Sequence, residues 1–247
     1  MSRRVLVTGG ASGIGLAVVK AFAREGDRVV SLDRQASGAA AVSVVGDVTD
    51  AADHRRAVDE ATEGDGMLDV LVANAGIHDG GADLTMSAED LAQVTRSVLD
   101  VDVVGYVLSL QAAASALGEA RGCAILTLSD SAFLAGHTGA GIAYTAAKYA
   151  GVGVTKWAAR ALAPTVRVNA IAPGGVLSGL QAVAADGTSQ GLFDDAERKS
   201  ELIQSRNVLG TIMSPAEIAD LYVFLASPAA RGMTGEILRP DGGLDVA

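Results

Sequence analysis

Short apolar runs alternate with longer amphipathic segments along most of the chain. The runs are rich in Val, Ile, Leu and Ala, as are strands that are buried on both faces of a parallel sheet. The segments between them repeat apolar residues with a helical period, as in Ile14, Val18 and Phe22. This alternation predicts an α/β fold, a doubly wound parallel sheet of seven strands with helices on both faces, in a single domain over 1–247. The predicted strands lie at 3–8, 28–32, 42–45, 68–73, 122–128, 165–171 and 235–238.

The first predicted strand leads into a glycine-rich turn, GGASGIG, and a helix starts directly after it. A helix N-terminus directs free N–H groups and the positive end of its dipole at one point, and this arrangement binds phosphate. Gly9 can adopt the positive φ of the turn, Gly13 lets the backbone approach a phosphate, and Gly15 lets helix and strand pack closely. Ser12 and Ile14 lie in the same turn. We therefore expect these five residues to bind the pyrophosphate of a dinucleotide.

Two carboxylates follow the second and third predicted strands. Asp33 lies about 20 residues beyond the glycine turn, where a carboxylate accepts hydrogen bonds from the adenosine ribose and repels the extra phosphate of NADP. Arg34 could accommodate that phosphate, but Asp33 is nearer the strand end, so we expect NAD as the cofactor. The stretch from Asp33 to the strand at 42–45 leaves room for no more than a turn of helix. Asp47 closes that strand, just before the helix expected from Ala51.

The overall charge and composition exclude several classes of function. The net charge of −10 argues against nucleic acids and anionic membranes as partners, because both bind clustered Lys and Arg. The single cysteine, Cys123, excludes an intrachain disulfide and fits a reducing compartment. No signal peptide fits before the first strand, and no spacing of His, Cys and carboxylates indicates a metal site. We expect a soluble, cytoplasmic protein that binds a small molecule and no metal.

An acid–base pair is expected on the helix that follows the strand at 122–128. Tyr144 and Lys148 form Y-x3-K, and residues four apart share one face of a helix. A nearby ammonium favours the phenolate and lowers the pKa of a tyrosine from its usual value of about 10. Such a pair, completed by a hydroxyl from the preceding loop, can move a proton while a nicotinamide moves a hydride.

Four motifs occur in one order along the chain: TG-x3-G-x-G at 8–15, NAG at 74–76, Y-x3-K at 144–148 and PGGVLS at 173–178. In this order they resemble the short-chain dehydrogenase/reductase family, over the whole chain. The resemblance implies a Rossmann-type fold and an NAD(P)-dependent oxidoreductase that transfers hydride between nicotinamide and a secondary alcohol or ketone. It also implies a homotetramer.

The resemblance also assigns roles to single residues. Asp47 would meet the adenine edge, although its position before a helix is equally typical of a cap. The Asn74 amide can tie neighbouring strands together. Ser178, where the family has Thr, keeps a hydroxyl for the carboxamide or the phosphates. The cofactor residues that the resemblance adds are Asn74, Ala75, Gly76, Tyr144, Lys148, Pro173, Gly174, Val176 and Ser178.

The catalytic serine has two candidates. Ser131 lies thirteen residues before Tyr144, the usual spacing in the family, and we expect Ser131, Tyr144 and Lys148 to be the catalytic residues. Ser129 is closer to the strand end, and a two-residue expansion of the loop would make it the partner instead. His78 and His137 could line a substrate pocket or be solvated.

The long apolar segment at 91–117 departs from the family pattern. A helix without a polar stripe needs burial on both sides, so we expect it to lie between the sheet and a second subunit. Where relatives have Asn, this chain has Asp102, ahead of Gly105. In relatives the Asn bends the helix and exposes a main-chain carbonyl for a water of the proton relay. An Asp can also bend a helix, so the role of Asp102 stays open, as does the alternative of a non-catalytic NAD-binding protein.

Small, polar and acidic residues interrupt the pattern at 179–207 and predict a mobile substrate lid. The stretches NAGIHD, LAPTVRVN and PGGVLSGL resemble cis-dihydrodiol dehydrogenases of aromatic degradation, which implies oxidation of a cyclic cis-diol to a catechol. A carbonyl reductase of the 3-oxoacyl type is the alternative. The apolar pocket for a ring would come from Phe133, Leu134, Leu180, Val183, Leu192 and Phe193.

Overall fold

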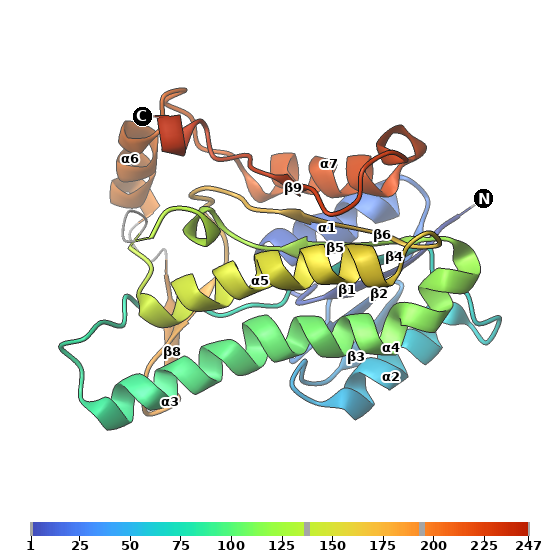
Figure 1. The fold of residues 1–247 in the computed structure, drawn as a ribbon, viewed down its shortest axis with the longest axis horizontal. Coiled ribbons are helices and arrows are strands. Elements are labelled where there is room, and N and C mark those ends of the chain that lie inside the picture. The colour runs from blue at the N-terminus through green and yellow to red at the C-terminus, as the bar shows by residue number, and fades with distance from the viewer. Residues whose placement is uncertain (1, 136–138, 193–195, 247) are drawn as a thin grey trace.

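The computed structural model describes residues 2–135, 139–192 and 196–246. Seven strands of these residues form one parallel sheet in the order β3-β2-β1-β4-β5-β6-β9 (Figure 1). The prediction of a doubly wound, seven-stranded sheet is confirmed. The strands are β1 (Arg4–Thr8), β2 (Arg28–Asp33), β3 (Val42–Val45), β4 (Val70–Ala73), β5 (Cys123–Thr127), β6 (Arg167–Ile171) and β9 (Ile237–Leu238).

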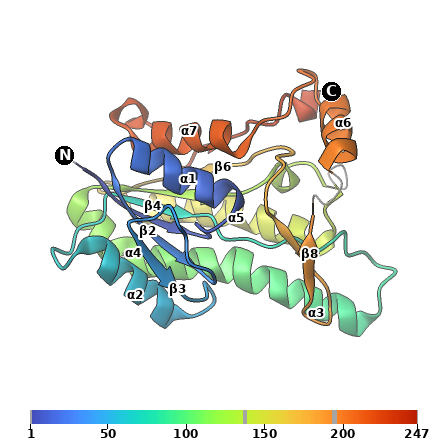
Figure 2. The ribbon, with the colours of Figure 1, turned by 180° about the vertical axis from the view of Figure 1, so that it is seen from behind.

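Helices cover both faces of the sheet (Figure 2). α1 (Gly13–Arg24) and α7 (Pro215–Ala226) pack on one face. α2 (Ala51–Thr62), α4 (Gly105–Ala120) and α5 (Ile142–Ala161) pack on the other. Because side chains alternate along a strand, β1 sends Val5 and Val7 into the first core and Leu6 into the second.

Local sequence sets the start of two helices. Ser214 accepts a hydrogen bond from the Glu217 N–H, and the Glu217 carboxylate accepts one from the Ser214 N–H, as the S-x-x-E sequence predicts. At α2 the N-cap is Asp50, so Asp47 is not the cap of this helix. Asp47 instead accepts hydrogen bonds from the N–H and hydroxyl of Thr49 and shapes the turn that precedes α2.

The connection between β2 and β3 contains no helix, as expected: all of residues 34–41 are described, and they form turns and bends. The long apolar segment differs from the expectation of one helix. It consists of α3 (Ala88–Leu99), a π-helical turn η1 (Asp100–Val104), and α4. The sequence leaves open whether Asp102 bends this helix. Asp102 lies within the π-helical turn, and such turns are a common cause of helix bending.

Residues 88–120 are long and apolar enough to cross a membrane by composition, with a mean hydropathy of 1.4 in their most apolar window. In the structure α4 instead packs against α2, α5, β4 and β5, and η1 carries the fully buried Asp102. These contacts are those of a core helix in a folded domain.

The segment expected to be a lid contains an antiparallel hairpin, β7 (Gln181–Val183) and β8 (Ser189–Gly191), followed by α6 (Ala196–Arg206). β7 is attached to the loop after β4. The His78 N–H donates to the Gln181 carbonyl, and the Val183 N–H donates to the His78 carbonyl, both at 2.8 Å. In Figure 1 the hairpin lies beside one end of α3 and α5, away from the N-terminus.

Candidate active site

A cavity lies at the carboxyl ends of β1, β2, β4, β5 and β6, where the open edges of α/β sheets bind ligands. All of the expected cofactor residues except Gly15 line it. They are Gly9, Ser12, Gly13, Ile14, Asp33, Asp47, Asn74, Ala75, Gly76, Tyr144, Lys148, Pro173, Gly174, Val176 and Ser178.

The geometry of the glycine turn fits a dinucleotide pyrophosphate. Gly9 has φ +70° and Gly13 has φ +55°, a region that favours glycine. A Cβ on Gly15 would lie 1.9 Å from the Gly9 carbonyl oxygen, so the helix can approach the turn only without a side chain there. A Cβ on Gly13 would lie 3.2 Å from the Gly179 N–H nitrogen. Gly15 therefore allows helix and turn to pack closely, while Gly9 and Gly13 line the cavity.

Asp33 is held in place at the end of β2. Its Oδ2 accepts a hydrogen bond from the Ala11 N–H and its Oδ1 accepts one from the Gln35 N–H, both at 3.0 Å. Both Asp33 and Arg34 line the cavity. A fixed carboxylate in this position can accept hydrogen bonds from the ribose hydroxyls of a dinucleotide.

Asn74 connects three strands beneath the cavity. Its Nδ2 donates to the carbonyls of Thr8 and Gly9, each at 3.2 Å, and its Oδ1 accepts from the Thr127 hydroxyl at 3.1 Å. Because that hydroxyl gives its proton to Asn74, the Tyr222 hydroxyl, 2.7 Å away, donates to Thr127. The Asn amide thus ties the ends of β1, β4 and β5 together, as expected.

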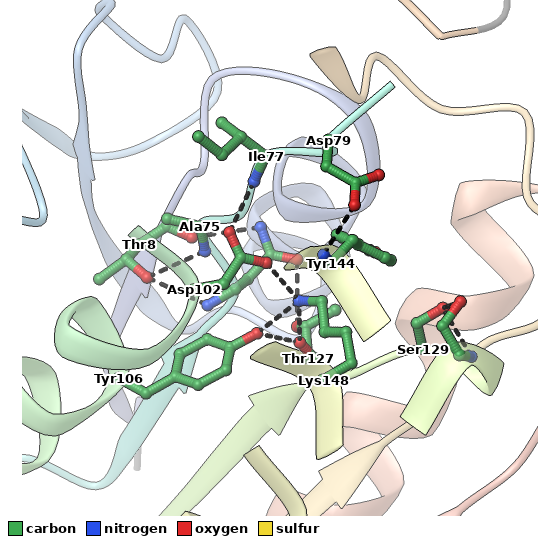
Figure 3. Close-up of polar contacts among 12 residues, drawn as sticks. Thr8, Ala75, Ile77, Asp79, Asp102, Tyr106, Thr127, Ser129, Tyr144 and Lys148 are labelled. Carbon is green, nitrogen blue, oxygen red and sulfur yellow. Dashed lines mark hydrogen bonds and ion pairs between the residues drawn. The ribbon is translucent and has the colours of Figure 1, made fainter. Parts of the chain in front are cut away.

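Tyr144 and Lys148 lie one turn apart on α5, both buried, and Lys148 Nζ is 5.2 Å from the centroid of the Tyr144 ring. The ammonium has three oxygen partners (Figure 3). They are the Tyr106 hydroxyl at 2.8 Å, the Thr127 carbonyl at 3.2 Å and Asp102 Oδ2 at 2.8 Å. The Tyr106 hydroxyl in turn donates to the Thr127 carbonyl.

The electrostatics of this cluster keep Lys148 charged. Burial acts to lower the pKa of Lys148, but the Asp102 carboxylate and two tyrosine hydroxyls outweigh it, and the pKa lies well above the usual value for lysine. Burial raises the pKa of Tyr144, Lys148 opposes this rise, and Asp102 adds to it. The pKa of Tyr144 therefore lies above its usual value in this structure, not below it as the sequence predicts, because the effect of burial outweighs that of Lys148.

Asp79, on the loop after β4, fixes the start of the helix that carries Tyr144. Its carboxylate accepts hydrogen bonds from the N–H groups of Gly141, the N-cap of α5, and of Tyr144, both at 2.9 Å. The neighbouring His78 places its ring centroid 4.5 Å from that of Tyr144. His78 and Asp79 therefore contact α5 through their side chains, and His78 contacts the hairpin β7–β8 through its backbone.

The two candidate serines differ in exposure. Ser129 follows the end of β5 and is part-buried, whereas Ser131 is only 1% exposed within the short 3-10 helix η2 (Asp130–Ala132). The Ser129 hydroxyl donates to Asp130 Oδ1 at 2.7 Å, and the Ser131 N–H donates to the same oxygen. Burial raises the pKa of Asp130, and these hydrogen bonds oppose the rise.

Comparison with known proteins agrees with this geometry. A family model described as enoyl-(acyl carrier protein) reductase, one of the models for short-chain dehydrogenases, matches residues 9–245. The chain belongs to the short-chain dehydrogenase/reductase family. As a member of this family it is an oxidoreductase that acts on CH–OH groups and uses a nicotinamide cofactor.

Several relatives in this family are dihydrodiol dehydrogenases. Cis-1,2-dihydrobenzene-1,2-diol dehydrogenase of Pseudomonas putida is 38% identical, over 98% of this chain and 91% of the relative. The 3-phenylpropionate-dihydrodiol/cinnamic acid-dihydrodiol dehydrogenase of Escherichia coli is 37% identical, over 98% of this chain and 93% of the relative.

Solved structures give the same family. Aldohexose dehydrogenase of Thermoplasma acidophilum, in ligand-free form, superposes with a TM-score of 0.85 and 28% identity, over 100% of this chain and 95% of that one. The 3-ketoacyl-(acyl-carrier-protein) reductase of Brucella melitensis, complexed with NADH, gives a TM-score of 0.81 and 26% identity, over 98% of each chain.

Three residues of this short-chain dehydrogenase/reductase site were not predicted from the sequence: Tyr106, Thr127 and Asp79. Thr127 and Tyr106 contribute through a carbonyl and a hydroxyl that converge on Lys148, and Asp79 acts across 62 residues of sequence on Gly141. Only the position of Thr127 at the end of a strand was a usable signal. The contacts of the other two depend on how the helices pack.

The expected apolar pocket is partly visible in the enzyme. Val183 packs with Tyr144 in one apolar cluster, and Leu180 lines the cofactor cavity. Phe133 instead packs on the main core, with the Arg239 guanidinium 4.5 Å above its ring. His137 and Phe193 lie outside the described residues.

Proposed function

We propose that this protein is an NAD-dependent cis-dihydrodiol dehydrogenase, which oxidises a cyclic cis-diol to a catechol. The buried Tyr144–Lys148 pair, in the same cavity as Asp33, carries the proposal of a dehydrogenase. The relatives named as dihydrodiol dehydrogenases, at 37% and 38% identity over nearly the whole chain, support the substrate class.

The chain's own residues supply binding and proton transfer. The glycine turn and Asp33 hold the dinucleotide, and bound NAD⁺ supplies the hydride acceptor. Tyr144 takes the proton of the hydroxyl that is oxidised; it acts in its phenolate form, which alkaline solution produces and the Lys148 ammonium stabilises. The Ser129 hydroxyl donates a hydrogen bond to the same oxygen. The ketone formed from a dihydrodiol tautomerises to a catechol, and the gain of aromaticity favours oxidation.

The choice of Ser129 over Ser131 is supported by exposure. A hydroxyl that orients a substrate has to reach the cavity, and Ser129 is the less buried of the two, directly after the cavity-lining Thr127 and Leu128. The spacing of thirteen residues to Tyr144 instead favours Ser131. The assignment of the catalytic serine therefore stays a prediction.

We also propose that the protein is a homo-oligomer, a tetramer as in the family, that associates through α4 and α5. Apolar side chains on these helices are exposed to solvent in the single chain. They are Val104 at the end of η1, Val107 on α4, and Ile142, Tyr149 and Trp157 on α5. A soluble monomer rarely exposes several large apolar side chains on neighbouring helices unless they form an interface.

The substrate proposal predicts that purified protein with NAD⁺ converts benzene or biphenyl cis-dihydrodiols to catechols. NADH formation by absorbance and catechol by chromatography measure the reaction. Simple secondary alcohols and a 3-hydroxyacyl thioester complete the panel. A protein that oxidises these alcohols well and forms no catechol is a dehydrogenase of another substrate class, and preferred turnover of the thioester identifies the 3-oxoacyl alternative.

The cofactor proposal predicts a higher kcat/KM with NAD⁺ than with NADP⁺. Replacing Asp33 with Ala removes the carboxylate that repels the 2′-phosphate, so the preference is expected to fall at least ~10-fold, or about 1.4 kcal/mol. Asp47→Ala, at the same cavity, is the matched control and is expected to change both cofactors alike. Equal or better use of NADP⁺ by the unmodified protein contradicts the proposal.

The catalytic proposal predicts that Tyr144→Phe lowers kcat about 100- to 10,000-fold, the usual contribution of a general base. The dissociation constant for NAD⁺ is expected to stay nearly unchanged, because the phenol acts on the substrate's proton. Ser129→Ala is expected to lower kcat far more than Ser131→Ala. The reverse order of the two serine variants assigns the role to Ser131.

The oligomer proposal predicts a tetramer by sedimentation equilibrium. Trp157→Glu, which places a charge on the exposed α5 surface, is expected to yield smaller species. Leu84→Glu is the matched control, because Leu84 is 80% exposed on a loop outside α4 and α5, against 74% for Trp157. A monomeric wild-type protein refutes this assembly.

A further inference from the structure

Asp102 distinguishes this site from the family pattern, because it places a carboxylate where the family has an uncharged amide. Its Oδ2 lies 2.8 Å from Lys148 Nζ, and its Oδ1 accepts a hydrogen bond from the Ile77 N–H at 2.8 Å. The side chains of Asp102 and Lys148 are 0% and 3% exposed. Figure 3 shows the carboxylate between the loop that follows β4 and the ammonium. Two opposite charges so close together, away from water, act on their surroundings as a nearly neutral pair.

Asp102, the third oxygen partner, reduces the net positive charge that Lys148 presents to Tyr144. A protonated lysine has three N–H donors, and Lys148 faces three oxygens, those of Tyr106, Thr127 and Asp102. An uncharged side chain at position 102 would leave the ammonium its two neutral partners and its full charge. That charge lies 5.2 Å from the centroid of the Tyr144 ring.

Tyr144 is surrounded by several other titratable groups. None of them except Lys148 carries a positive charge at alkaline pH, so the ammonium is what favours the phenolate there. Removing the Asp102 carboxylate is therefore expected to favour the phenolate of Tyr144. Among the described residues, the groups that face Tyr144 are Lys148 on α5, Asp102 on η1, Tyr106 on α4, His78 and Asp79 on the loop after β4, and Asp130 on η2.

We propose that Asp102 is a positioning residue that acts on Tyr144 through Lys148. Its carboxylate cancels the charge of the ammonium and thereby restricts alcohol oxidation to more alkaline solutions than an uncharged residue at this position would. The inference rests on the proposed function only in taking Tyr144 as the proton acceptor.

Asp102→Asn is nearly isosteric and tests the charge. Asn has one acceptor oxygen, so it can serve the Ile77 N–H or Lys148 but not both as Asp102 does. Asp100→Asn is the matched control, because Asp100 is an exposed carboxylate on the same π-helical turn. Asp102→Ser is a second neutral variant that carries the same prediction if Asp102→Asn fails to fold, as judged by circular dichroism.

The first measurement is the pH dependence of kcat/KM for any alcohol that the protein oxidises. Oxidation needs the Tyr144 phenolate, so the rate falls on the acid side as the phenol is protonated. In Asp102→Asn this acid limb is expected to move about one unit to lower pH, the low end of the shift that a charge within 4–6 Å produces. The Asp100→Asn profile is expected to superimpose on that of the wild type.

The second measurement does not depend on the substrate. The phenolate absorbance of Tyr144 is titrated in protein saturated with NAD⁺, with the same variant carrying Tyr144→Phe subtracted. Phenolate is expected to form at lower pH in Asp102→Asn than in the wild type.

The two readouts separate the inference from the proposed function. Shifted phenolate formation without any turnover of dihydrodiols supports the role of Asp102 and contradicts the substrate proposal. Turnover of dihydrodiols with superimposable profiles for wild type and Asp102→Asn overturns the inference alone. A shift of either readout to higher pH also overturns it.

Discussion

Burying a charged ammonium requires oxygen atoms around it, and this requirement organises the active site. Lys148 is reached by a carbonyl at the end of β5, a hydroxyl on α4 and a carboxylate on η1. Three elements must therefore meet at one point before the charge is stable there. The three contacts that stabilise the buried charge also hold the ammonium beside the Tyr144 ring, and so they set the electrostatic environment of the phenol.

A second chain of polar contacts extends from this point under the cofactor cavity. Thr127, whose carbonyl accepts from Lys148, gives its hydroxyl proton to Asn74 and receives one from Tyr222 on α7. Asn74 continues the chain to Gly9 in the glycine turn. Helices on both faces of the sheet are thus joined to the glycine turn through hydrogen-bonded groups, and such networks keep a site rigid.

The local sequence was sufficient for the fold and for the cofactor side of the cavity. The parallel sheet with helices on both faces follows from short apolar runs alternating with helices, since parallel strands need crossovers. The roles of Gly9 and Gly15 follow from backbone geometry within a few residues, so a single turn encodes them. Asp33 lies at a strand end, which fixes its position without knowledge of packing. Each of these features depends on neighbours in sequence, and the sequence therefore determined them.

Only the tertiary structure decided the surroundings of Tyr144 and Lys148. Asp102, Tyr106 and Asp79 act on residues 42 to 65 positions away, and no periodicity or motif encodes such a distance. Whether Asp102 only bends its helix or also pairs with Lys148 depends on how η1 packs against α5. The exposure of Ser129 relative to Ser131 depends on how the loop after β5 folds. Long-range packing fixes which charges share a buried volume, and the sequence by itself determines only which charges are available.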